Sequence, residues 1–221
     1  MQQLKDDSEF AAARERMVDE QIAARGVRDW RVLEAMRAIP RERFVPHAIR
    51  AEAYEDRALP IDCGQTISQP YMVGLMTATL CVGRDQRVLE VGTGSGYQTA
   101  VLSRLAAQVF TIERHAELLR QARDRLDRLG LTNVCYRIGD GSLGWPEEAP
   151  FDGILVTAGA PRVPENLIEQ LAIGGRLVVP IGEPDAQMLV SIERTTAGPV
   201  RTDVLGCRFV KLIGAAAWPD E

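Results

Sequence analysis

Residues 88–96 read Val-Leu-Glu-Val-Gly-Thr-Gly-Ser-Gly, and this stretch decides how the chain is expected to fold. A short apolar run that contains one acidic residue, Glu90, leads into three alternating glycines. The run indicates a buried β-strand, and the glycines indicate a tight turn into a helix. Because glycine lacks a Cβ, its backbone can come close to a ligand. Such a turn is typical of a nucleotide-type cofactor site at the end of a parallel strand, although a plain strand-to-helix turn would leave the same pattern.

The spacing of the glycines narrows the class of cofactor. Gly92, Gly94 and Gly96 follow G-x-G-x-G, and Tyr97 stands where the dinucleotide fingerprint G-x-G-x-x-G needs its last glycine. No lysine follows the glycines, as a phosphate-binding P-loop would require. The loop is therefore not expected to bind a dinucleotide or a nucleoside triphosphate.

Two acidic residues point to a particular cofactor. A carboxylate at Glu90 would repel a pyrophosphate but attract an ammonium or a sulfonium. S-adenosyl-L-methionine carries both of these cations and no phosphate, and its ribose hydroxyls need an acceptor. The next expected strand, residues 109–113, ends in such an acceptor, Glu113, about twenty residues after the first glycine. We therefore predict S-adenosyl-L-methionine as cofactor, with S-adenosyl-L-homocysteine as its product.

Composition excludes several classes of protein. The net charge of −5 at pH 7 gives no overall field that would favour nucleic acid. No apolar run approaches the roughly 20 residues of a membrane helix, and residues 1–10 are polar, unlike a signal peptide. We therefore expect no nucleic-acid partner, no membrane partner and a cytoplasmic location.

The cysteines and histidines offer little redox or metal chemistry. The four cysteines lie far apart and form no C-x-x-C pair, which fits a reducing compartment. Cys81 and Cys135 have apolar neighbours and are expected to be buried thiols. With only His47 and His115 in the chain, we expect no metal site.

The first part of the chain reads as helical. Ser8 could cap a helix that ends near Gly26, and Asp29 could begin a second helix that buries Trp30 and ends before Pro40. We treat residues 1–63 as a helical N-terminal extension. Further along, Pro70 suits the first turn of a helix over 71–81, which Gly83 would close.

Strand and helix patterns then alternate. The expected elements are strand 86–91, helix 96–107, strand 109–113, helix 115–129, strand 134–138, strand 151–157, helix 164–172, strand 176–181, and a closing antiparallel pair, 187–195 and 203–213. Such alternation indicates βαβ units. The prediction is an α/β, Rossmann-like, class I S-adenosylmethionine-dependent methyltransferase fold, with a doubly wound, mostly parallel sheet over 64–221. The whole chain, 1–221, is expected to form a single methyltransferase domain.

Blocks of sequence from about Met17 to Leu212 carry a more specific signal. They are Met17-Val18 with Gln21, Val32–Met36, Pro40-Arg41, Phe44–Pro46, Ala58–Ile61, Gly64–Pro70, Val88–Gln98, Gly139–Gly141 and the run from Gly174 to Gly182. On these blocks the chain resembles the protein-L-isoaspartate (D-aspartate) O-methyltransferase family. The glycine loop is common to many methyltransferases, whereas the turn Gln65–Pro70 is far more specific to this family.

The resemblance implies methyl transfer to the carboxylate of L-isoaspartyl residues in damaged proteins and peptides, as a step of protein repair. It implies that Ser68 is the active-site serine, that Glu113 holds the ribose, and that Asp140 with Gly141 holds the adenine end. The expected cofactor-binding residues are Gln65, Thr66, Ile67, Ser68, Glu90, Gly92, Thr93, Gly94, Ser95, Gly96, Glu113, Arg114, Asp140 and Gly141. The expected partners are isoaspartyl-containing proteins and peptides, with the enzyme itself a monomer.

The chemistry of this reaction suits a chain poor in histidine. A carboxylate is already ionised at pH 7, so it needs no strong general base. What remains is in-line alignment, and a serine hydroxyl can orient the carboxylate through one hydrogen bond. On local sequence alone, however, Ser68 could equally cap the following helix, and Asp140 could be a turn residue between glycines.

The C-terminal block departs from the family pattern. Lys211 stands in Val210-Lys211-Leu212, where the family usually has Val-Pro-Leu, and Cys63 and Gly74 also differ. Because the C-terminal strand is expected to border the peptide site, two other functions stay open. One is methylation of another small-molecule carboxylate, and the other is a cofactor-binding paralogue without turnover.

Overall fold

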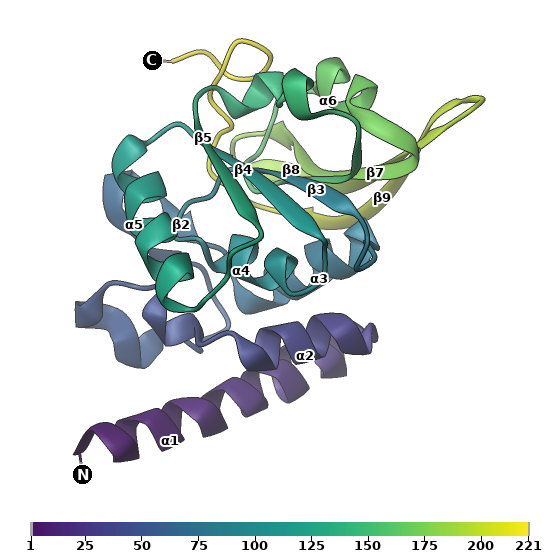
Figure 1. The fold of residues 1–221 in the computed structure, drawn as a ribbon. Coiled ribbons are helices and arrows are strands. Elements are labelled where there is room, and N and C mark those ends of the chain that lie inside the picture. Colours follow the sequence, from purple (N-terminus) through teal and green to yellow (C-terminus); the bar gives the residue numbers. More distant parts are fainter. Residues whose placement is uncertain (1, 221) are drawn as a thin grey trace.

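The computed structural model describes residues 2–220 and builds them around a seven-stranded sheet (Figure 1). The spatial order is β5-β4-β3-β6-β7-β8-β9. The strands from β5 to β7 pair in parallel, and β8 and β9 add an antiparallel edge. The predicted α/β class with a mostly parallel, doubly wound sheet is therefore confirmed. The strands are β3 Arg87–Val91, β4 Gln108–Glu113, β5 Val134–Ile138, β6 Phe151–Val156, β7 Leu171–Glu183, β8 Ala186–Thr195 and β9 Gly198–Cys207.

Helices cover both faces of the sheet, and two short strands stand apart from it. The α-helices are α1 Gln2–Arg16, α2 Trp30–Ala38, α3 Pro70–Leu80, α4 Tyr97–Ser103, α5 Ala116–Arg128 and α6 Glu165–Glu169. The short strands β1 Leu59–Pro60 and β2 Thr66–Ile67 pair antiparallel. Short helical segments of three to six residues span Met17–Ile22, Ala23–Arg25, Arg41–Arg43, His47–Glu52, Asp62–Gly64, Gly141–Leu143 and Pro146–Glu148.

The alternation of side chains along β3 separates two apolar cores. Val88 faces a core that also contains residues of α3, α4 and the N-terminal helices. Leu89 and Val91 face a second core, which contains Leu167 of α6. Because successive strand residues point to opposite faces, each central strand contributes to both cores.

The N-terminal helices pack against the first core. Met17, Val18 and Ile22 are fully buried there together with Met36 of α2. Figure 1 shows α1 and α2 below the sheet, and Arg37 of α2 joins Glu15 of α1 by a 2.7 Å ion pair. No helix among residues 2–220 is long and apolar enough to cross a membrane.

Two helix boundaries follow the local signals, and two predictions in this region are wrong. Asp29 caps α2, accepting a 2.9 Å hydrogen bond from the Arg31 amide, and Gly26 ends the first helical segment with φ 97°. Ser8 is not a cap, because α1 already begins at Gln2. Trp30 is 64% exposed, because it is the first residue of α2 and lies off its buried face.

The strand predicted over 203–213 lies earlier in the chain, as β9 over Gly198–Cys207. β9 ends at Cys207, and the chain then crosses to the end of β6. There Gly159 donates to the Val210 carbonyl at 2.7 Å and accepts from the Leu212 amide at 2.8 Å. The helix expected over 164–172 is also short, because β7 already begins at Leu171.

The four cysteines are free, as the sequence suggested, but Cys81 is not buried. It is exposed and ends α3 in the left-handed conformation, with φ 58° and ψ 42°. Gly83 was predicted to close this helix, and Cys81 does so two residues earlier. Cys135 is only half-buried.

Replacing Cys81 with glycine is expected to stabilise the protein. The left-handed conformation costs an L-residue roughly 1–2 kcal/mol, and the greater freedom of glycine in the unfolded chain offsets part of that gain. We expect the free energy of unfolding of Cys81→Gly to rise by about 0.5–1 kcal/mol in urea titrations. Cys81→Ala keeps a Cβ and serves as control, and an equal gain in both variants would contradict the role of backbone strain.

Candidate active site

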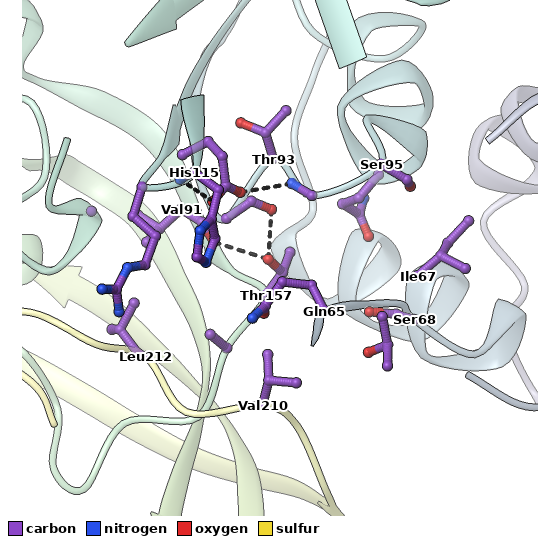
Figure 2. A pocket seen from close by; sticks show the side chains of 18 of the residues that line it. Gln65, Ile67, Ser68, Val91, Thr93, Ser95, His115, Thr157, Val210 and Leu212 are labelled. Carbon is purple, nitrogen blue, oxygen red and sulfur yellow. Dashed lines mark hydrogen bonds between the residues drawn. The ribbon is translucent and has the colours of Figure 1, made fainter. Parts of the chain in front are cut away.

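A cavity opens at the carboxyl ends of β3, β4 and β6, where the strand order reverses direction. Ligands of open α/β sheets bind at this topological switch point. Three stretches of chain form most of the wall, and Figure 2 shows side chains from each of them. They are the turn Gln65–Ser68, the glycine loop with the end of β4, and the returning segment Val210–Ile213.

The glycine loop is shaped by close packing. Gly92 has φ 97°, and a Cβ added to it would lie 2.3 Å from Oγ1 of Thr157. The same hydroxyl donates to the Gly92 carbonyl at 2.7 Å (Figure 2). Gly96 has φ 88°, and its Cβ would lie 3.0 Å from Cβ of Ala122 in α5. Side chains are therefore excluded from both ends of the loop, and Gly92, Thr93, Gly94 and Ser95 line the cavity.

The Glu113 carboxylate fixes the middle of the loop. Glu113 ends β4 and is only 6% exposed. Its Oε2 accepts from the Gly94 amide at 2.9 Å, and its Oε1 accepts from the His115 amide at 3.0 Å. A carboxylate has about four lone-pair directions, so both oxygens can still accept from a ligand. Glu113 also lines the cavity, as do Arg114 and His115.

Glu90 lies beneath the loop and does not line the cavity. Its side chain is fully buried, and Oε2 accepts from Thr99 at 2.5 Å and from Thr111 at 2.7 Å. Burial raises the pKa of Glu90 to about 8, against the lowering effect of the two threonine hydroxyls. The expectation of direct contact with the cationic groups of the cofactor is therefore wrong, because the side chain points into the protein between β3, α4 and β4.

The turn Gln65–Ser68 forms the opposite wall. The pairing of β1 with β2 and the 2.9 Å hydrogen bond from the Ile61 amide to the Gln65 carbonyl hold the turn in place. In Figure 2, Gln65 and Ser68 lie on one side of the cavity, with His115 and Leu212 on the other. The N-cap of α3 is Gln69, with Pro70 at the first helical position. The alternative interpretation of Ser68 as a helix cap is therefore wrong.

The remaining predicted residues fall into two groups. Gly141 lines the cavity, and a Cβ on it would lie 2.5 Å from Cγ1 of Val91. Gly96 lies outside the cavity wall, and Asp140 lines an adjoining hollow that shares Arg114 and Ile213 with the cavity. The Asp140 carboxylate accepts from the Ser142 amide at 2.9 Å and from the Ala215 amide at 2.7 Å. Asp140 is thus a turn residue that also holds the C-terminal segment.

Several cavity residues were not predicted from the sequence. Thr157 and Ala158 follow β6, and the position just after a central parallel strand was the available signal for them. His115 occupies the N-cap position of α5 and also lines the cavity. Among residues 2–220, no group of His, Cys, Asp and Glu is arranged to hold a metal ion.

The fold and this cavity together define a class I S-adenosylmethionine-dependent methyltransferase. The sheet order reverses beside β3, the glycine turn follows β3, and an acidic residue ends β4.

A family model and several relatives similar to this chain carry the same description. The family model described as protein-L-isoaspartate(D-aspartate) O-methyltransferase (PCMT) matches residues 12–217. A protein-L-isoaspartate O-methyltransferase of Geobacter metallireducens is 56% identical over 213 residues, covering 96% of this chain and 99% of the relative. One of Syntrophus aciditrophicus is 57% identical over 212 residues, covering 95% and 97%. This chain belongs to the protein-L-isoaspartate (D-aspartate) O-methyltransferase family.

Solved structures agree with this assignment. A protein-L-isoaspartate O-methyltransferase superposes with a TM-score of 0.81 at 32% identity, covering 92% of this chain and 67% of that chain. A Plasmodium falciparum structure of the same description, in complex with S-adenosyl-L-homocysteine, gives a TM-score of 0.78 at 26% identity. It covers 90% of this chain and 98% of that chain.

Glu90 is expected to make stability depend on pH in a definite direction. Its pKa is about 8 in the folded protein and near 4.5 in the unfolded chain. Between these values the folded state binds more protons, so the contribution of Glu90 to stability falls as pH rises. Glu90→Gln cannot ionise, and its free energy of unfolding should therefore rise relative to wild type from pH 5 to pH 8. Urea unfolding at intervals across this range measures the difference, and a constant difference would refute the argument.

Proposed function

We propose that this protein transfers the methyl group of S-adenosyl-L-methionine to the carboxylate of L-isoaspartyl residues in damaged proteins and peptides. The observation that carries the proposal is that Gln65–Ser68, the turn most specific to the family, borders the same cavity as the glycine loop. The methyl ester formed would collapse to a succinimide, whose hydrolysis restores some normal aspartyl linkages. The reaction is therefore a step in protein repair.

The residues around the cavity fit the proposed cofactor. Gly92 and Gly94 in the loop present backbone without side chains, so a polar ligand can approach it closely there. Glu113 carries unused lone pairs at the edge of the loop and would accept from the ribose hydroxyls. Gly141, packed on Val91, leaves room for the adenine end. Bound there, the cofactor supplies an electrophilic methyl group on a sulfonium.

Other predicted residues would act indirectly. Glu90 binds Thr99 and Thr111 and would support the strand below the loop rather than touch the cofactor. Gly96 allows α4 to pack on α5, and Asp140 holds the C-terminal segment. The residues proposed to contact the cofactor directly are then Gln65, Thr66, Ile67, Ser68, Gly92, Thr93, Gly94, Ser95, Glu113, Arg114 and Gly141.

Ser68 would orient the substrate. The isoaspartyl carboxylate is ionised at neutral pH and needs no base to remove a proton. The Ser68 hydroxyl would donate to one carboxylate oxygen, leaving the other free to attack the methyl carbon in line with sulfur. Ser68 is therefore proposed as the catalytic residue, through alignment rather than proton transfer.

The proposal extends to the oligomeric state and the cellular location of the protein. The four free cysteines fit a reducing compartment, so a cytoplasmic location is proposed. We also propose that the protein is a monomer, that it acts on proteins and peptides, and that it has neither nucleic acid nor a membrane as partner.

One observation favours a second candidate function, the methylation of another small-molecule carboxylate. Lys211, where the family usually has proline, is exposed and lines the cavity. A cation there could bind an additional carboxylate of a small-molecule acid.

A pair of matched peptides tests the substrate. The protein is incubated with S-adenosyl-L-methionine labelled on the methyl group and with two peptides that differ only in an isoaspartyl or an aspartyl linkage. We expect base-labile label on the isoaspartyl peptide alone, because only its carboxylate has the required position. Label on neither peptide would reject the proposal, and transfer to small carboxylic acids instead would favour the second candidate.

Ser68→Ala tests the catalytic residue. A hydrogen bond to a charged group contributes roughly 1.5–3 kcal/mol, so we expect kcat to fall by about tenfold to a hundredfold. The Kd for S-adenosyl-L-homocysteine should stay close to that of wild type, because the glycine loop and Glu113 remain. Ser191→Ala, in β8 and away from the cavity wall, is the matched control. An unchanged kcat in Ser68→Ala would rule out the assigned role.

A further inference from the structure

A fully buried arginine, Arg41, stands behind the turn that carries Ser68. It begins the helical turn Arg41–Arg43 directly after Pro40, and its side chain has no exposed surface. Burial lowers its pKa to about 10, so it is still charged at neutral pH. No ion pair recorded among residues 2–220 includes Arg41, and its Nη1 finds no hydrogen-bond partner among them.

The guanidinium contacts three separate parts of the chain. Its Nη2 donates to the Ser68 carbonyl at 2.8 Å, and its Nε donates to the Ala53 carbonyl at 2.7 Å. Its Cζ lies 4.8 Å from the centre of the Tyr97 ring. Tyr97 is fully buried and directly follows the last glycine of the loop. Arg41 therefore touches both the substrate side and the cofactor side of the cavity from behind.

Packing alone does not explain why an arginine occupies this buried position. A buried charge without a carboxylate partner is costly, and an apolar side chain of similar volume is often as stable or more stable in such a place. What an apolar side chain cannot do is hold two carbonyls in fixed directions. The rigid, planar fork of arginine does so, and lysine lacks that fork.

The contact with Ser68 has a direct geometric consequence. A hydrogen bond to the Ser68 carbonyl fixes the peptide plane between Ser68 and Gln69, and with it the direction of the serine side chain. The Tyr97 ring under the same guanidinium sets the distance from that turn to the glycine loop. In-line transfer between two bound groups is sensitive to displacements of about 1 Å.

We infer that Arg41 is a positioning residue for methyl transfer: its guanidinium holds the Ser68 turn at a fixed separation and angle from the start of α4. The inference rests on the proposed function and extends it to a residue that does not line the cavity. Its effect should fall on the alignment of substrate with the methyl group and leave cofactor affinity almost untouched.

Two substitutions test this role. Arg41→Met keeps the apolar volume and is expected to fold, and Arg41→Lys keeps the charge but not the fork. In both we expect kcat per S-adenosyl-L-homocysteine-binding site to fall by at least about tenfold. The KM for S-adenosyl-L-methionine and the Kd for S-adenosyl-L-homocysteine should stay within about twofold of wild type. A kcat per binding site within twofold of wild type in Arg41→Lys would overturn the inference. So would a proportional loss of kcat and cofactor affinity, since that indicates general loosening of the fold.

Hydrogen exchange gives a second readout that does not depend on turnover. In Arg41→Lys the backbone amides of residues 65–69 should exchange faster, while those of β3 keep the wild-type rate, because the substitution loosens the hold on the Ser68 and Ala53 carbonyls and neither residue lies on β3. Unchanged exchange over 65–69 would also overturn the inference. Hydrogen exchange also tests the role of Arg41 independently of the proposed function. If wild-type protein fails to methylate the isoaspartyl peptide, the proposed substrate is rejected, but the exchange result still shows whether Arg41 holds the Ser68 turn.

Arg31→Lys is the matched control. Arg31 also donates to a backbone carbonyl, that of Val82 at 3.2 Å, but it lies on α2 away from the cavity wall and pairs with Asp29. We expect its kcat and cofactor affinity to equal those of wild type.

Discussion

The structure depends on one constraint at the end of β3. Val88–Val91 are buried, every residue of α4 from Tyr97 to Ser103 is buried, and only Gly92–Gly96 join them. The chain must therefore turn within five residues while packed on both sides. Positive φ at Gly92 and Gly96 makes the turn possible, and the contacts with Thr157 and Ala122 leave no space for side chains. The resulting loop offers bare backbone to the cavity at Gly92 and Gly94, and the ligand site is a consequence of the packing.

Buried ionisable side chains surround this loop, and each accepts or donates hydrogen bonds. Glu90 lies below it, Glu113 holds its middle, and Arg41 lies behind the turn that faces it. Burying charged groups opposes folding unless they are hydrogen-bonded. Of the three groups, Glu113 lines the cavity, while Glu90 and Arg41 lie behind its walls. The cost in stability of burying these groups is therefore concentrated around the site.

Local signals predicted much of the architecture. Strand 134–138 has the predicted bounds, Asp29 caps α2, and the alternation of elements led to the correct sheet class. The errors have physical causes. Ser8 is an acceptable cap, but the helix extends beyond it. Cys81 takes a conformation that glycine prefers. Trp30 fits the apolar period of α2, yet as its first residue it lies off the buried face. The strand expected over 203–213 begins earlier, at Gly198, and the chain leaves the sheet after Cys207.

The sequence by itself determined the class of fold, the glycine turn after β3 and the family, because periodicity, glycine spacing and sequence blocks are properties of neighbouring residues. Only the tertiary structure decided which side chains reach the cavity. It turned Glu90 inward to Thr99 and Thr111, engaged Asp140 with the C-terminal segment, and brought Val210–Leu212 back to Gly159. It also placed Arg41 against the Ser68 carbonyl, 27 residues further along the chain. These contacts depend on how distant segments pack together, and no local pattern records that packing.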